Sequence, residues 1–380
     1  MILSSINLKN FRSHKEIQLK FSGSLNYIVG GNGQGKTSIL EAIYYLCTTR
    51  SNSSKSDSEV VCFNENEFEI TGVFMTKAGA GSSEAKVFYS LTDNKKFYFQ
   101  NNKHINRAAD IIGKYPVVLL TPADHSITQG SPGDRRKFVD SVISQASSAY
   151  LKNLLDYNRT LRHRSSLLTS IKESRSRSSF EELDAWSEKL VKTGSELIKS
   201  RIKFVNEFDE YISLSYKRIM EDTEVPKIKY SYLPSDSGND AANQNKNTEE
   251  IFIESLSRKK EEEIKRGINL VGPHRDDFIF EINSLNLRMF GSQGQHKTFQ
   301  VVLRFAEFFY LKEITGKAPI FLLDDVFGEL DASRSMKISE YLREVGQAFI
   351  TITDFANFSF LLKTDADTII KLNRGEAVYA

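Results

Sequence analysis

Apolar and polar residues alternate along the first part of the chain, and this alternation predicts paired β-strands. The pattern covers ILSSINLKNF (2–11), EIQLKF (16–21) and SLNYIVG (24–30). In SILEAIYYL (38–46) the apolar residues recur at helical spacing instead. After a polar stretch at 50–60, which we expect to be a loop, further strands are predicted at 67–74, 85–91, 95–100 and 115–120.

The middle of the chain has a different pattern. From residue 132 to about residue 220, long stretches carry helical periodicity, with one break predicted at 172–180. Residues 234–250 have the composition of a disordered loop, and residues 251–267 predict a charged helix. Strands are predicted again towards the end of the chain, at 268–272, 278–282, 285–290, 318–325, 347–354 and 367–372.

These elements predict an α/β body that is divided by a mostly helical insertion. We expect a head made of residues 1–131 and 263–380, and a second lobe made of residues 132–262 with the disordered loop at 234–250. A chain of 380 residues is long enough for two such domains.

Composition narrows the class of protein. Hydrophobic content of 40% and charged content of 26% are ordinary for a globular protein, and no apolar run approaches the roughly 18–20 residues that a membrane span needs. Cys47 and Cys62 fit no metal spacing or disulfide framework, and the N-terminus lacks the pattern of a secretory signal, so we expect a cytoplasmic protein. The net charge of +2 means that any nucleic-acid contact requires a local concentration of basic residues.

The stretch GGNGQGKTS (30–38) follows a predicted strand, precedes a predicted helix and matches G-x-x-x-x-G-K-[ST]. Glycines let the backbone amides point at an anion, and the helix N-terminus favours phosphate. Lys36 would reach the β- and γ-phosphates of ATP, and the Thr37 hydroxyl would bind Mg²⁺. A glycine turn without a ligand is the alternative, which the strand–loop–helix context disfavours. The predicted nucleotide-binding residues are Gly30, Gly31, Asn32, Gly33, Gln34, Gly35, Lys36, Thr37 and Ser38.

The acidic partner of this loop is IFLLDDVFGELD (320–331), where an apolar strand runs into two carboxylates. Asp324 is placed to bind Mg²⁺, and Asp325 is placed to orient or deprotonate the attacking water. Alone, the pattern also fits a strand that ends in an acidic turn. Together with the glycine loop, it predicts an ATPase in which Lys36 and Asp325 are the catalytic residues.

A second glycine-containing string, GSQGQHKT (291–298), stands just before a helix-like run and shortly before the acidic strand. A Ser-Gly-Gln element in this order resembles the signature of ABC-type ATPases, although a linker would also fit the string alone. The resemblance implies that Ser292, Gly294 and Gln295 cap the γ-phosphate of an ATP molecule held by a second subunit, and therefore that the chain acts as a dimer.

Several motifs together resemble the RecF family of ABC-type ATPases. They are LKNFRSH (8–14), TPADHSITQGSPGDRRKFVD (121–140), VGPHRDD (271–277), GSQGQ (291–295) and LLDDVFGELD (322–331). The resemblance implies an α/β P-loop NTPase head of the ABC type with an inserted, mostly helical lobe, and it places Arg12 near the phosphates. It also implies dimerisation on ATP, slow hydrolysis, DNA binding, and work with RecR and RecO in loading RecA at gaps during recombinational repair, replication and the SOS response.

Some positions depart from the pattern of this family. Ala123 stands where an acid is usual, Gly328 stands where Ser or Ala is usual, Thr121-Pro122 occupies the place of a metal-sensing glutamine, and Asp354 occupies the place of a histidine. We therefore expect weak hydrolysis. An ABC transporter subunit and a scaffold that binds ATP without turnover are the alternatives. The inserted lobe and the missing histidine disfavour the first, and Asp325 with a complete loop disfavours the second.

Basic residues concentrate in the predicted insertion. Residues 151–203 contain a net excess of five positive charges, clustered near the predicted helix break. Such groups suit contacts with the phosphate backbone, and no base-reading motif is present, so we expect sequence-independent binding of single- or double-stranded DNA. A solvated helix face is the alternative for each residue. The predicted DNA contacts are Arg135, Arg136, Lys137, Arg162, Arg164, Arg175 and Arg177.

Overall fold

The computed structural model describes residues 1–75, 81–174, 177–220, 224–233, 247–329, 331–353, 364–373 and 376–379. The chain forms two compact units. The first comprises Met1–His125, Leu214–Glu224 and Lys297–Ala380, and the second comprises Ser126–Ser213 and Val225–His296. The second unit contains the insertion predicted at 132–262 except for Leu214–Glu224.

The first unit contains an antiparallel sheet of strand order β2-β1-β4-β5-β6-β7. Along most of these strands, alternate side chains are buried, as in a sheet that packs on one face only. The structure therefore confirms the strands that were predicted from the alternation of apolar and polar residues. The strands are β1 (Ile2–Phe11), β2 (His14–Lys20), β4 (Glu67–Met75), β5 (Ser82–Ser90), β6 (Lys95–Gln100) and β7 (Lys103–Ile105).

The same unit contains a second sheet of strand order β15-β14-β3-β13-β12-β8, which is parallel except for β15. In four strands of this sheet, β3, β8, β12 and β13, every residue is buried, as expected for parallel strands covered on both faces. The strands are β3 (Leu25–Val29), β8 (Val117–Leu120), β12 (Ile320–Leu323), β13 (Ala348–Ile352), β14 (Thr368–Asn373) and β15 (Glu376–Tyr379).

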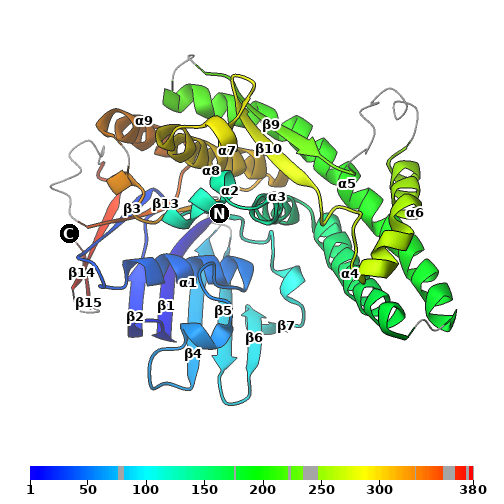
Figure 1. The fold of residues 1–380 in the computed structure, drawn as a ribbon. Coiled ribbons are helices and arrows are strands. Elements are labelled where there is room, and N and C mark those ends of the chain that lie inside the picture. The colour runs from blue at the N-terminus through cyan, green and yellow to red at the C-terminus, as the bar shows by residue number, and fades with distance from the viewer. Residues whose placement is uncertain are drawn as a thin grey trace. The chain divides into compact units, whose positions relative to one another are not determined.

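Helix α1 (Lys36–Thr48) packs between these two sheets and joins them into one core (Figure 1). Its apolar residues Ile39, Ile43 and Leu46 are fully buried and belong to a cluster with side chains of both sheets. The remaining helical segments that contribute to the first unit are η1 (Asp57–Val60), η2 (Ala108–Asp110), η3 (Pro122–Asp124), α8 (Gln293–Thr315), η5 (Phe327–Glu329) and α9 (Ala332–Leu342).

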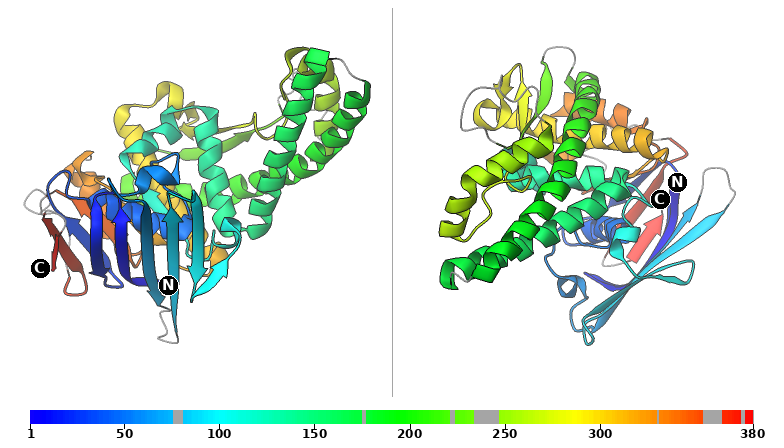
Figure 2. Two further views of the ribbon diagram at one scale, coloured as in Figure 1. Left: turned by 90° about the horizontal axis from the view of Figure 1, so that it is seen from below. Right: turned by 90° about the vertical axis from the view of Figure 1, so that its right-hand side faces the viewer.

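The second unit is mostly helical and carries a three-stranded sheet of order β11-β10-β9. Two of its long helices, α4 and α6, lie side by side (Figure 2), and Leu168, Leu183 and Ile264 pack together in this unit. Its elements are α2 (His125–Gln129), α3 (Pro132–Ala146), α4 (Ser148–Ser174), α5 (Arg177–Met220, shared with the first unit), β9 (Pro226–Ser231), α6 (Thr248–Arg266), β10 (Asp277–Ile282), β11 (Leu285–Asn286) and α7 (Leu287–Phe290).

Some local predictions are corrected. Residues 268–272 form a loop rather than a strand, and the strand predicted at 285–290 stops at Asn286, whose side chain caps α7 by accepting a hydrogen bond from the Met289 amide. In the loop predicted at 234–250, residues 234–246 lie outside the described residues, whereas Asn247 caps α6 and pairs reciprocally with Glu250.

Two further features were not predicted. The helical stretch after residue 132 is interrupted at Ser147, between α3 and α4, where the Ser147 hydroxyl accepts a hydrogen bond from the Tyr150 amide. Strand β9 was also missed, although its residues alternate between buried and exposed. Among the described residues, no helix is both long and apolar enough to cross a bilayer.

Candidate functional site

The glycine loop lies between the end of β3 at Val29 and the start of α1 at Lys36. Gly33 and Gly35 have φ values of 76° and 88°, in the left-handed region that glycine tolerates best. A Cβ on Gly35 would lie 2.5 Å from His14 Nε2. His14 is buried, and its Nε2 lies 3.0 Å from the Gly35 carbonyl oxygen, so its ring packs against the loop at Gly35. No role for His14 was predicted from the sequence, where it stands at the end of the LKNFRSH motif.

Lys36 folds back over this loop. Its Nζ donates hydrogen bonds to the carbonyl oxygens of Gly30 at 2.7 Å and Gly31 at 3.0 Å. Burial lowers the pKa of Lys36, while the negative charges of Asp325 and Asp324 oppose that shift. The ammonium group therefore stands beside the first amides of α1, which carry the positive end of the helix dipole. Together they place positive charge where the glycine loop meets the helix, which is the polarity that a phosphate group requires.

The predicted metal ligands meet directly. Thr37 Oγ1 donates a hydrogen bond to Asp324 Oδ1 at 3.0 Å. Burial raises the pKa of Asp324, although hydrogen bonds from Thr351 and Thr37 act in the opposite direction. A hydroxyl and one carboxylate beside a phosphate site suit Mg²⁺, which binds through few protein oxygens and completes its shell with phosphate and water. Within the described residues, no group of three or more His, Cys, Asp or Glu side chains forms a separate metal cage.

Asp325 stands at the end of the acidic strand in an unusual conformation. Its φ is 50°, its side chain is exposed, and its amide donates a hydrogen bond to Thr351 Oγ1 at 2.9 Å. Non-glycine residues at positive φ are uncommon and gather at functional sites. The structure thus brings the two predicted acids to one edge of the parallel sheet, beside Thr37. It adds Thr351, which was not predicted from the sequence.

Arg12 is held by helix α1. Its guanidinium makes two hydrogen bonds to the Glu41 carboxylate, at 2.8 and 2.7 Å, and further bonds to Ser53 and Ser54. Burial by itself would raise the pKa of Glu41, but hydrogen bonds from Arg12 and neighbouring serines outweigh it, so the pKa lies below its usual range. Its predicted contact with phosphates stays a prediction.

The second glycine-containing string begins α8. Ser292 Oγ accepts a hydrogen bond from the Gln295 amide at 3.2 Å, and Gln295 Oε1 accepts one from the Ser292 amide at 2.9 Å. This reciprocal pair is a capping box. The helix therefore starts at Gln293, and Gly294 and Gln295 lie in its first turn rather than ahead of it. Ser292 is exposed, and accepting the Gln295 bond does not use its hydroxyl proton.

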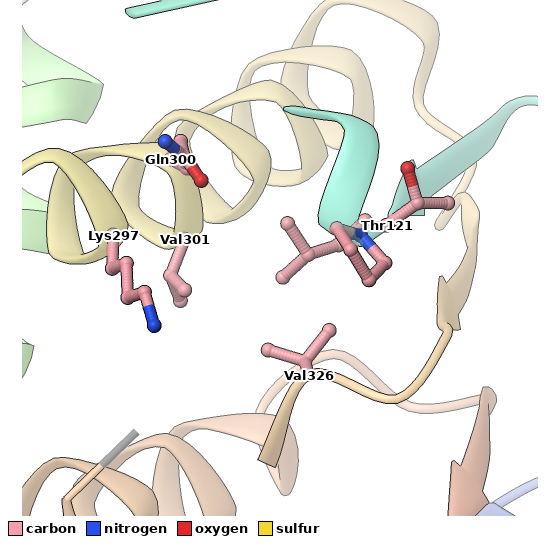
Figure 3. A pocket seen from close by; sticks show the side chains of 7 residues that line it. Thr121, Lys297, Gln300, Val301 and Val326 are labelled. Carbon is pink, nitrogen blue, oxygen red and sulfur yellow. The ribbon is translucent and has the colours of Figure 1, made fainter. Parts of the chain in front are cut away.

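A small open hollow lies in the first unit at the carboxyl ends of β8 and β12 (Figure 3). The end of β8 contributes Thr121, the segment after β12 contributes Val326, and α8 contributes the other labelled side chains, Lys297, Gln300 and Val301. Because parallel strands end at one edge of the sheet, this hollow opens on the same edge as Asp325. Gln300 of α8 and Thr121 after β8 both line this hollow.

The acid next to Ala123 has a defined partner. Arg304 is half-buried and makes two hydrogen bonds to Asp124, at 2.9 and 2.8 Å, and one to Glu307 at 2.7 Å. Burial raises the pKa of Glu307 to about 7, although Arg304 opposes the shift. This buried group links the end of β8 to α8 within the first unit.

The VGPHRDD motif (271–277) lies in the second unit, where four of its seven residues are buried and Arg275 is exposed. His274 Nδ1 lies 2.7 Å from the Tyr157 hydroxyl, Asp276 lies 3.7 Å from the Arg201 guanidinium, and Arg135 Nε donates to Asp277 at 2.7 Å. Burial lowers the pKa of His274 to about 4 and raises that of Asp276 to about 6. The motif therefore fixes a loop to the helices and to β10 through buried hydrogen bonds.

Two of the predicted DNA contacts are corrected. Arg164 is 1% exposed and binds Glu263 at 2.6 Å, and Arg135 is 3% exposed and binds Asp277. A side chain that is buried and ion-paired inside the protein does not meet a phosphate backbone in this state. Both residues therefore stabilise the second unit instead.

The remaining predicted contacts differ in exposure. Lys137 and Arg162 are exposed. Arg136 is half-buried and donates a hydrogen bond to the Asp276 carbonyl oxygen. Arg175 and the side chain of Arg177 lie outside the described residues, as does Asp354. The surface available for a phosphate backbone thus includes Lys137 and Arg162, whose DNA contacts stay predictions.

Comparison with known proteins decides the family. The model of the RecF/RecN/SMC N-terminal domain matches residues 2–373. A DNA replication and repair protein RecF from Chloroherpeton thalassium is 40% identical over 365 residues, which cover 94% of this chain and 96% of that one. The chain belongs to the RecF family. A RecF protein from Clostridium tetani is 33% identical, and the alignment covers 100% of both chains.

Solved structures with a similar fold are known for this RecF-family chain. A structure described as the recombination mediator protein RecF-ATP in the RecFOR pathway is 31% identical, with a TM-score of 0.87 over 100% of this chain and 97% of that chain. An Smc head domain derived from Pyrococcus furiosus is 15% identical with a TM-score of 0.57 and is therefore similar in fold alone. The predicted fold class, an ABC-type ATPase head with an inserted lobe, is confirmed.

Proposed function

We propose that this RecF-family chain is an ATP-dependent DNA-binding protein of DNA repair and replication, which dimerises on ATP and hydrolyses it slowly. The observation that carries the proposal is the hydrogen bond from Thr37 to Asp324, 3.0 Å long, beside a complete phosphate loop. The RecF relatives, which are named for DNA replication and repair, and the RecF-ATP structure support it.

The residues of the loop would bind and orient the triphosphate. Lys36 and the first amides of α1 would neutralise phosphate oxygens, while Thr37 and Asp324 would hold Mg²⁺. When bound there, Mg²⁺ offsets the charge that develops on the phosphate oxygens. Asp325 would orient the attacking water and accept its proton.

Dimerisation would complete the site. The hydroxyl of Ser292 and the first amides of α8, in the second unit, would bind the γ-phosphate of an ATP molecule held by another copy of the chain. ATP would favour the dimer over the monomer because ADP lacks that phosphate, and a ligand shifts an equilibrium only by its differential affinity for the two states.

DNA would bind through its backbone and independently of sequence. The exposed side chains of Lys137 and Arg162 supply positive charge. We infer that DNA raises the slow rate of ATP hydrolysis and that hydrolysis reopens the clamp around DNA. Because the chain belongs to the RecF family, its partners would be RecR and RecO. With them it would support the loading of RecA at gaps and the SOS response. We expect it to act in the cytoplasm.

One binding experiment tests this function. The affinity for duplex and single-stranded DNA is measured with ATP and Mg²⁺, with ADP, and without nucleotide, at two salt concentrations. We expect the tightest binding with ATP and a loss of affinity at the higher salt concentration. Equal affinity for DNA in all three nucleotide states would show that ATP does not control DNA binding. An affinity that does not change with salt would contradict binding through the phosphate backbone.

A further inference from the structure

Thr351 is a hydroxyl buried in an otherwise apolar strand. Strand β13 reads AFITI, all five residues are buried, and Thr351 is 1% exposed. A buried polar group costs free energy unless it is hydrogen-bonded, and a strand position of this kind accepts valine equally well. The hydroxyl therefore requires an explanation in the contacts that it makes.

The strand register places Thr351 level with the acids. Strand β13 lies between β3 and β12, so it separates the strand that leads into the phosphate loop from the strand that leads into the acids. Ile350 pairs with Leu323, the last residue of β12. The next residue on each strand is therefore Thr351 on one side and Asp324 on the other.

The hydroxyl of Thr351 bonds to both acidic residues at once. Oγ1 donates to Asp324 Oδ1 at 2.8 Å and accepts from the Asp325 amide at 2.9 Å. Asp324 Oδ1 also accepts from Thr37, so two hydroxyls orient the same carboxylate. The bond to the amide holds Asp325 in its turn at a φ of 50°.

We propose that Thr351 is a positioning residue, which orients the Asp324 carboxylate for the metal ion and fixes the backbone turn that presents Asp325 to the attacking water. This inference rests on the proposed function for its consequence in catalysis. The hydrogen bonds themselves belong to the nucleotide-free chain, so the positioning role can be tested without ATP.

The first test measures hydrogen exchange of the Asp325 amide in the nucleotide-free protein. Thr351→Val removes both hydrogen bonds, and we expect exchange at Asp325 to accelerate by about tenfold or more. Thr351→Ser retains the hydroxyl and keeps the slow exchange. The matched control is Thr298→Val, because Thr298 is also buried in the first unit and its hydroxyl has no hydrogen-bond partner among the described residues.

The second test separates binding from turnover. In Thr351→Val we expect the Mg²⁺-free affinity for ATP to be unchanged, the Mg²⁺ concentration needed for tight binding to rise, and turnover to fall by about tenfold or more. Thr351→Ser restores both quantities. Should Thr351→Val not fold, Thr351→Ala is measured in its place.

Two results would overturn the proposal. One is exchange at Asp325 that is as slow in Thr351→Val as in Thr298→Val. The other is a loss of turnover that Thr351→Ser does not repair, which would indicate packing rather than hydrogen bonding. If wild-type protein fails to bind ATP, the proposed function fails, whereas the exchange measurement still decides the role of Thr351.

Discussion

Thr37 and Asp324 are 287 positions apart in the chain, yet their side-chain oxygens lie 3.0 Å from each other. The contact exists because β3, which precedes Thr37, and β12, which precedes Asp324, are parallel strands of one sheet with only β13 between them. The carboxyl ends of parallel strands meet at one edge, where α/β proteins bind their ligands. The proposed Mg²⁺ site thus depends on the topology of the sheet.

Lys36→Ala should weaken ATP binding by about tenfold to a hundredfold, because a charge-assisted hydrogen bond to phosphate is worth about 1.5–3 kcal/mol. Titration with a fluorescent ATP analogue measures the change. Lys95→Ala is the control, since Lys95 is exposed at the start of β6. Unchanged affinity in Lys36→Ala would contradict the assignment of the loop.

Asp325→Asn should reduce ATP turnover by about a hundredfold or more, because an amide does not accept the proton of the attacking water. ATP binding should remain, since Lys36 and Thr37 are untouched. Single-turnover hydrolysis and equilibrium binding distinguish the two effects. Asp365→Asn, at an exposed position, is the control. Full turnover in Asp325→Asn would show that another residue accepts the proton of the attacking water.

Arg164→Met should destabilise the protein by about 3–5 kcal/mol, because it leaves the buried Glu263 carboxylate without its cation. The midpoint of urea denaturation measures this loss, and a second substitution, Glu263→Met, should recover much of it. Arg162→Met, at an exposed position, should change stability by less than about 0.5 kcal/mol and weaken DNA binding instead. Equal stability of the two single variants would refute the buried role of Arg164.

His274 should make the protein less stable in acid. Burial lowers its pKa to about 4, below the value of 6.5 expected in the unfolded chain. Between these values the unfolded chain binds the additional proton, so the stability contributed by His274 rises with pH from about 4 to 6.5, by about 2–3 kcal/mol between pH 4.5 and 7. Asp276, whose pKa is raised to about 6, contributes with the opposite sign.

The His274→Gln variant isolates this contribution. Urea midpoints at pH 4.5 and pH 7 are compared for wild type, His274→Gln and the exposed control His104→Gln. We expect a smaller difference between the two pH values in His274→Gln alone. The same pH dependence in all three proteins would show that His274 does not titrate as its burial implies.

The phosphate loop and its acids could be predicted from the sequence because their chemistry depends on short runs of residues. Thr351 could not, since a threonine in an apolar strand resembles any β-branched core residue until the strand order is known. The prediction for Arg164 was wrong because a count of charges carries no information about burial. Its helix did contain a signal: Tyr157, Leu168 and Ile171, at helical spacing from it, are all buried.

Light scattering measures most directly whether ATP joins two copies of the chain through Ser292. Wild-type protein with ATP and Mg²⁺ should have twice the mass that it has with ADP. Ser292→Arg should bind ATP and remain monomeric, while Ser213→Arg, at an exposed position on α5, should dimerise as wild type does. A Ser292→Arg protein that still doubles its mass with ATP would show that the dimer does not form through Ser292.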